Sequence, residues 1–231
     1  LDDFFHEYFS HHLNGKEFIH AVSLSVFDTF DSELLRYFFD SEGEELLTKL
    51  SERHLFLLPA GPESRRYHPL LREYLIKLFS NRREEEKIPH YTAAAKYFTR
   101  KKETGKAVRF YASAGSLEEA KNHFIPLADK LLESNAYESL NALISYFPEE
   151  EKETDLYLAY YDGIVANLVK PFSSREKLLS LLDAFHHKKD YAREAKIFNE
   201  LLTNYLFYFE QEELISELIE KASAFLAEYK V

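Results

Sequence analysis

Apolar residues recur three and four positions apart along nearly the whole chain, which is the spacing of one face of an α-helix rather than of a β-strand. In the last segment, Leu218, Ala222 and Phe225 belong to one apolar stripe, and glutamates lie mostly on the opposite face. Leu178 and Phe185 belong to a similar stripe. Only 6 glycines and 7 prolines interrupt the pattern. The chain is therefore predicted to be mostly all-α.

The periodic segments define the predicted helices. They cover residues 1–12, 16–25, 31–39, 43–51, 70–79, 88–102, 105–113, 116–134, 136–146, 154–169, 174–187, 190–208 and 211–229. Ser116 and Ser173 are each followed three residues later by glutamate, which is the spacing of a capping box at the start of a helix. Pro126 is expected to kink or interrupt its helix, because proline lacks the backbone N–H that the helix uses.

The helical pattern is interrupted at one place, by two short extended segments. Residues 54–58 and 65–68 lie on either side of a turn that is rich in proline and glycine, which predicts a β-hairpin. Pro69 cannot continue a strand but suits the first turn of a helix, so His68 is expected where the second strand meets the next helix. Outside residues 53–68 we expect essentially no strand.

This order of elements predicts two domains. Helices followed by a small hairpin over residues 1–80 are typical of a winged-helix domain. Residues 81–231 contain amphipathic helices joined by short turns, which predicts antiparallel hairpins stacked as a helical-repeat solenoid of the tetratricopeptide type. That assignment rests on architecture, because the repeat consensus is poor.

Rows of aromatic residues lie within the predicted repeats. One contains Tyr157, Tyr160 and Tyr161, and another runs from Tyr205 through Phe207, Tyr208 and Phe209. Aromatic residues at helical spacing mostly pack between helices, and this is the interpretation that we favour. A ligand groove is the alternative.

The charge and the missing residue types narrow the function. The net charge of −11 and the pI near 5.4 oppose strong binding to DNA or to anionic lipid. No apolar run approaches the ~20 residues of a membrane span, and the first residues lack the order of a signal peptide, so a cytoplasmic location is expected. Cysteine is absent, which excludes thiolate chemistry. The absence of methionine favours a piece of a longer protein.

No catalytic or metal constellation stands out. The adjacent pairs His11–His12 and His186–His187 point about 100° apart on a helix, so they do not form the chelate of helical zinc sites, and no metal is expected. The glutamate runs at 84–86 and 149–151 are interpreted as solvated faces or loops. We therefore expect no enzyme activity from this chain.

One stretch resembles a known family. The run LLTKLSERHLFLLPAGPESRRYHPLLREYLIKLF, residues 46–79, is similar to the segment that follows the ATPase core in MalT-like, LuxR-tailed transcriptional regulators, and RYHPLLREYL is its most specific part. The similarity continues through YTAAAKYF, GKAVRFYASAGSLEEAK and LNALISYFPEEE, over roughly residues 1–170. Relatives commonly carry an aromatic residue just before the arginine, where this chain has Ser64 and Arg65.

The resemblance implies a role in signal transduction. Such regulators bind ATP or ADP, and inducer together with ATP drives their oligomerisation. The chain would be the arm and sensor part, with an upstream ATPase core, a downstream DNA-binding domain, and an unidentified inducer or regulatory protein as partners. The sequence has no GxxxxGK[ST] loop and no basic helix-turn-helix, so this part alone would neither hydrolyse ATP nor bind DNA.

The resemblance also assigns a site. His68 occupies the position of the histidine that contacts the ADP β-phosphate in related switches, and Arg66 is a weaker candidate for the same phosphate. The competing interpretation is that His68 is a structural hydrogen-bonding residue between wing and helix, while Arg65 and Arg66 are solvated charges. The alternative function is a tetratricopeptide-type protein-interaction scaffold without nucleotide involvement.

Overall fold

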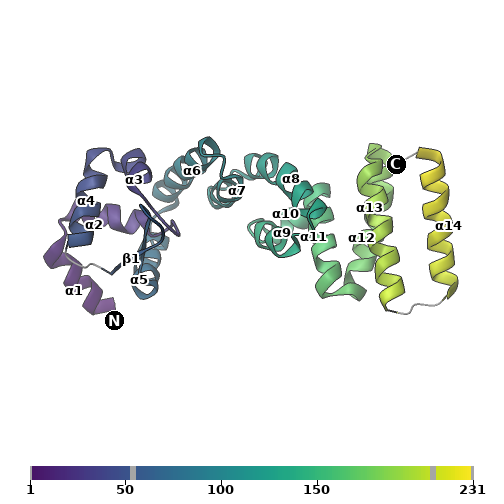
Figure 1. Cartoon of the computed structure of the whole chain (residues 1–231), viewed down its shortest axis with the longest axis horizontal. Coiled ribbons are helices and arrows are strands. Elements are labelled where there is room, and N and C mark those ends of the chain that lie inside the picture. The colour runs from purple at the N-terminus through teal and green to yellow at the C-terminus, as the bar shows by residue number, and fades with distance from the viewer. Residues whose placement is uncertain (1, 53–55, 209–211, 230–231) are drawn as a thin grey trace. The chain divides into compact units, whose positions relative to one another are not determined.

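A computed structural model describes residues 2–52, 56–208 and 212–229, and 80% of it is helical, so the predicted all-α class is confirmed in outline. The elements in chain order are α1 (Asp2–His12), α2 (Gly15–Leu24), α3 (Ser32–Phe39), α4 (Ser41–Glu52), β1 (Leu57–Pro59), β2 (Arg65–Tyr67), α5 (Pro69–Ser80), α6 (Glu84–Arg100), α7 (Thr104–Ser113), α8 (Leu117–Glu133), α9 (Tyr137–Ile144), α10 (Glu149–Thr154), α11 (Leu156–Val169), α12 (Pro171–Lys188), α13 (Tyr191–Phe207) and α14 (Glu212–Tyr229) (Figure 1). No helix within these described ranges is long and apolar enough to cross a membrane.

The chain divides into two compact units, Leu1–Ala120 and Lys121–Val231. The first unit has a single core in which α1 to α7 and the hairpin all bury apolar side chains. Its largest fully buried side chains include Phe5, Phe9, Phe27, Phe30, Phe79 and Phe110. Helices α3 and α4 approach so closely that a Cβ on Gly43 would lie 2.6 Å from the Leu35 carbonyl oxygen, so glycine is required there.

The predicted hairpin is present. β1 and β2 pair antiparallel, with Leu57 opposite Tyr67 and Pro59 opposite Arg65. Phe30, on the loop between α2 and α3, adds an isolated bridge to Arg65 that the sequence did not predict, with N···O distances of 2.9 and 2.8 Å. These are all the strand pairings in the described part of the chain. The start of the predicted first strand, at residues 54–55, lies outside it.

Helices α6 and α7 complete the first core. The rings of Phe98 and Phe110 stack with their centroids 5.5 Å apart, and Phe27 lies 5.3 Å from Phe110. The Arg109 guanidinium donates to the Asp28 carboxylate at 2.8 Å. Because these helices cover the core, the compact unit continues past residue 80, where the winged-helix domain was predicted to end. The assignment of domains to residues 1–80 and 81–231 stays a prediction.

In the second unit, α10 to α14 pack against one another in chain order, and α11 also contacts α9 and α13. Figure 1 shows α12, α13 and α14 side by side, as the short predicted turns require. The tetratricopeptide-like arrangement itself stays a prediction. The apolar stripe of α14 is covered only in part: Leu218 and Phe225 are buried, whereas Leu226 is 47% exposed. The reason is that α13 is the main neighbour of α14.

Three local predictions were wrong in whole or in part. The expected interruption at Pro126 is absent, because α8 continues through this residue, while the alternative of a kink stays a prediction. Helix α12 begins at Pro171 with Lys170 as its N-cap, so Ser173 does not start the helix. Residues 149–154 form the separate helix α10, where no helix was predicted, although Glu149 and Glu150 are exposed as expected of a solvated run. Three of its four glutamates lie in the first turn, where a negative charge interacts favourably with the helix dipole.

His90 on α6 ties this helix to the first core. Its ring centroid lies 5.0 Å from that of Phe38 and 5.4 Å from that of Phe79, and its Nε2 is 3.0 Å from the Ser23 carbonyl oxygen. The ring therefore donates from Nε2 in its neutral form. Burial lowers the pKa of His90 to about 4, because it outweighs the hydrogen bond to Ser23, which raises the pKa, and the nearby Arg82 charge acts in the same direction as burial.

We predict that the first unit loses stability as the pH falls from 6.5 toward 4. The unfolded chain takes up a proton near its ordinary pKa of about 6.5, whereas the folded chain resists protonation of His90 until about pH 4. The shifted pKa of His90 should lower the free energy of unfolding by at most about 2 kcal/mol at pH 5. Urea unfolding at pH 7 and pH 5 measures it. His90→Gln should flatten the dependence, and the exposed His11→Gln should not; equal slopes in both variants would contradict the assignment.

Candidate functional site

The first candidate site lies where β2 meets α5. His68 is the N-cap of α5, with Pro69 at the first helical position, as predicted. The His68 backbone N–H donates to the Phe56 carbonyl at 2.6 Å, and the two rings meet edge to face with centroids 6.3 Å apart. The His68 Nδ1 accepts weakly from the Leu70 N–H at 3.4 Å. This contact places the imidazole N–H on Nε2, so a half-buried ring keeps one donor that the cap does not use.

Strand alternation in β2 places Arg66 on the face opposite Tyr67. Side chains of a strand point alternately to opposite faces, and Tyr67 is buried at 2% exposure. Its hydroxyl donates to the Ala21 carbonyl at 3.1 Å, and burial raises the pKa of Tyr67. Arg66 is exposed and has no ion pair in the described part of the chain. Arg66 and His68 are two residues apart, and His68 lies outside β2 as the N-cap of α5.

A shallow groove of about 690 Å³ lies beside this turn. Arg66 and Tyr67 line it together with Pro69, Arg72 and other residues of α5, and His68 is not among its lining residues. Arg72 is already engaged there, because it donates to the Asp28 carboxylate at 2.7 Å and to the Ser25 carbonyl at 3.1 Å. Arg66 is thus the lining arginine whose charge is left uncompensated.

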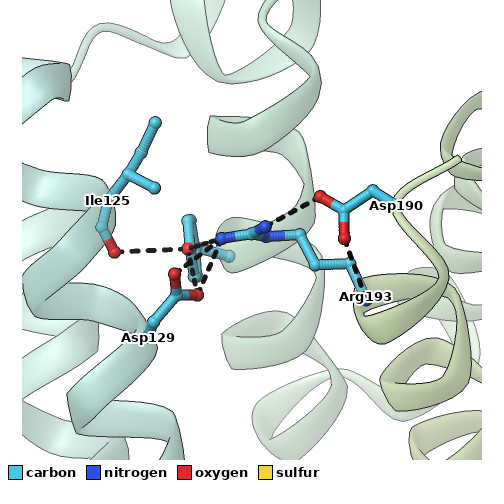
Figure 2. A network of polar contacts seen from close by, with 5 residues as sticks. Ile125, Asp129, Asp190 and Arg193 are labelled. Carbon is cyan, nitrogen blue, oxygen red and sulfur yellow. Dashed lines mark hydrogen bonds and ion pairs between the residues drawn. The ribbon is translucent and has the colours of Figure 1, made fainter. Parts of the chain in front are cut away.

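A second candidate site lies in the second compact unit, around Arg193 at the start of α13. Figure 2 shows its guanidinium between the carboxylates of Asp129 on α8 and Asp190. Nη2 donates to both Asp129 oxygens at 2.8 and 2.7 Å and to the Tyr161 hydroxyl at 2.9 Å, and Nη1 donates to Asp190 at 2.8 Å. The Tyr161 hydroxyl in turn donates to Asp129 at 2.6 Å, so its 3.4 Å approach to the Ile125 carbonyl is secondary.

The charges of this network compensate one another. Burial alone would lower the pKa of Arg193, but the bonds to Tyr161 and Asp190 and the charge of Asp129 outweigh it and hold that pKa above its usual value. Burial and the Asp129 carboxylate raise the pKa of Tyr161. Asp190 also caps α13, because its carboxylate accepts from the Arg193 N–H. The network therefore fixes how α8, α11 and α13 pack, and it presents a charged surface between them.

Sequence reasoning missed this network. Asp129 and Arg193 are 64 residues apart, and neither belongs to a recognisable motif. The one local signal is that Asp190 and Arg193 are spaced three apart at a helix start. Tyr160 and Tyr161 are buried, as the packing interpretation predicted, whereas Phe207 is 76% exposed and Phe209 lies outside the described residues. For metals, the described side chains contain no cluster of three or more histidine, aspartate or glutamate residues that could hold an ion.

With the geometry described, comparison with known proteins gives one clear result. Residues 16–87 match the MalT winged helix domain. The matched segment begins in α2, ends in α6 and includes both strands, Arg66 and His68. No curated protein and no solved structure matches the chain. The comparison supports a MalT-like winged helix over this segment, which is shorter than the predicted resemblance over residues 1–170.

We predict that Arg193→Gln lowers the free energy of unfolding of the second unit by about 2 kcal/mol. Removing the guanidinium leaves Asp129 and Asp190 without their counter-charge, and the cost stays below the ~3–5 kcal/mol of a fully buried pair because the Asp129 side chain is 42% exposed. Urea denaturation measures this free energy. When Asp129→Asn is added to Arg193→Gln in a double-mutant cycle, the double variant should regain about 1 kcal/mol of the lost free energy of unfolding. The exposed Lys221→Gln on α14 is the control and should have almost no effect. Strict additivity of the two network substitutions would contradict the predicted coupling.

Proposed function

We propose that this chain is the arm and sensor part of a MalT-type, ATP-dependent transcription regulator that acts in the cytoplasm. In this proposal the winged helix responds to the nucleotide state of an ATPase core elsewhere in the protein, and the helical second unit responds to an inducer or a regulatory protein. The observation that carries the proposal is the match of residues 16–87 to the MalT winged helix domain, which includes the turn at His68. Oligomerisation and DNA binding by a LuxR-type tail belong to the same proposal.

The residues at this turn fit a phosphate group. Nε2–H of His68 is a donor that the N-cap leaves unused, Arg66 is an exposed cation two residues before it, and the first turn of α5 adds the positive end of a helix dipole. ADP would supply the phosphate charge that these groups recognise. His68 would donate a hydrogen bond, and Arg66 would contribute a charge that is not already compensated. No residue of this chain is assigned a catalytic role.

The proposed effect is on an equilibrium between two states. A contact that His68 makes only in the ADP-bound state stabilises that state relative to the ATP-bound one. A charge-assisted hydrogen bond to a phosphate is worth on the order of 1.5–3 kcal/mol, which corresponds to roughly tenfold to a hundredfold in the ratio of the two states. The resting, inactive state would therefore depend on His68.

We predict that His68→Ala, made in the complete protein that the gene encodes, raises inducer-independent transcription by roughly tenfold or more. A transcription reporter in the absence of inducer measures it. His68→Asn is the matched control for folding, because asparagine keeps an N-cap acceptor for the Leu70 N–H while the imidazole is lost. His68→Ala should cost up to about 1 kcal/mol of stability through the lost cap, and His68→Asn should cost less.

Two outcomes separate the nucleotide role from the structural one. If both variants are active without inducer while His68→Asn melts like the unsubstituted protein, the phosphate contact is supported. If His68→Ala only lowers the melting temperature and His68→Asn restores normal regulation, His68 is a capping residue of the wing. In that case the nucleotide role is abandoned, and a protein-interaction scaffold without nucleotide involvement becomes the better account.

A further inference from the structure

A pocket of about 370 Å³ opens in the second compact unit between α8, α11 and α13. Asp129 and Glu133 line it from α8, Tyr160 from α11, and Arg193 and Lys196 from α13. The volume is near the lower end of the range for small-molecule sites, ~300–1,000 Å³. The Arg193 network of Figure 2 forms one wall and holds that wall in a fixed geometry. The pocket is therefore of a size and rigidity suited to a compound smaller than a typical drug.

Tyr160 supplies the first sign that this pocket receives a ligand. The residue is only 2% exposed, yet its hydroxyl has no hydrogen-bond partner among the described residues. A buried tyrosine hydroxyl ordinarily finds a partner, as that of Tyr161 does with Asp129 at 2.6 Å. The Tyr160 oxygen is also not among the fully enclosed unpaired atoms of the chain, so it is accessible at the pocket surface. A bound molecule can satisfy this hydroxyl, and the fold does not.

The charges around the pocket decide which kind of molecule fits. Asp129 and Asp190 compensate Arg193 through short hydrogen bonds, and Lys196 lies 3.1 Å from the Glu200 carboxylate. Glu133 is exposed and forms no ion pair within the described ranges. Both cations are thus already paired, and the carboxylate that remains is negative. An anion would face Glu133 and Asp129 without a free cation to meet it, whereas a cation would find Glu133 available.

We propose that this pocket binds a small organic cation, with a primary amine at the Glu133 carboxylate and a neutral hydrogen-bonding group at the Tyr160 hydroxyl. The amine donates a hydrogen bond to the Glu133 carboxylate, and the second group forms a hydrogen bond with the Tyr160 hydroxyl. Interpreting this molecule as the inducer rests on the proposed regulatory function, but the binding itself does not.

Three probes of the same length test the charge preference. The compound 4-aminobutan-1-ol carries the amine and a hydroxyl, butane-1,4-diol is its neutral analogue, and 4-hydroxybutanoate is its anionic analogue. Each is titrated into the full 231-residue chain at low ionic strength and followed by amide ¹H–¹⁵N chemical shifts. The amine should cause saturable shifts at residues 129–133 and 192–196 with at least about fivefold higher affinity than the diol. The anion should bind most weakly.

Two substitutions test the two contacts separately. Glu133→Gln should weaken the amine about fivefold, because Glu133 is exposed and its charge is screened, and it should leave the diol unchanged. Tyr160→Phe should weaken both compounds by about two- to tenfold through the lost hydrogen bond. The matched controls are Glu138→Gln on α9 and Tyr146→Phe, which remove the same groups outside the pocket and should leave the affinities unchanged. Far-UV circular dichroism and melting verify that all variants are folded.

The absence of saturable shifts with all three probes overturns the proposal, as does tighter binding of 4-hydroxybutanoate than of the amine. Unchanged amine binding in Glu133→Gln overturns it as well. The test is independent of the nucleotide switch: amine binding in the pocket supports the proposal even if His68→Ala has no effect in the reporter assay, and that second result counts only against the proposed function.

Discussion

The burial of aromatic side chains between short helices is the constraint on which both compact units depend. Several of the described helices, such as α3 and α9, are shorter than the ~12–15 residues below which an isolated helix is only marginally stable in water. Each therefore needs a neighbour to cover its apolar face. In the first unit, Phe27 contacts rings from three helices, including Phe98 and Phe110 at 6.1 and 5.3 Å. In the second, Phe124 joins Phe147 and Tyr161, each at 5.2 Å.

The same constraint positions the chemistry of the wing. Two strands of three residues each form too few hydrogen bonds to hold a hairpin by themselves. The hairpin is held because Phe30 bridges to Arg65 and because Tyr67 is buried, with its ring 5.0 Å from that of Phe30. Once Tyr67 faces the core, alternation turns Arg66 outward, and Pro69 fixes the helix start that leaves His68 at its cap. The candidate phosphate contacts are thus a consequence of core packing.

Much of this fold could be predicted from the sequence, because helical periodicity and the Pro69 signal are local properties. The hairpin, the cap at His68 and nearly all helices follow from them. The close approach at Gly43 and the bond between Asp129 and Arg193 could not be predicted, since they depend on which helices meet in space. The start of α10 was missed because a run of glutamates, without apolar periodicity, looks the same in a loop and in a first helical turn.

The two candidate sites share a physical property that separates them from the many satisfied polar groups of the chain. The Tyr67 and Tyr161 hydroxyls are both hydrogen-bonded within the fold, so they contribute to packing and leave nothing for a ligand. His68 and Tyr160 are also held by packing, but each keeps a hydrogen-bonding valence that no described residue uses. A side chain that packing already holds in place has little conformational entropy left to lose when a ligand binds. An immobilised polar group without a partner is therefore better prepared for binding than a mobile one on the surface, which is why these two residues, rather than the abundant exposed charges, define the sites.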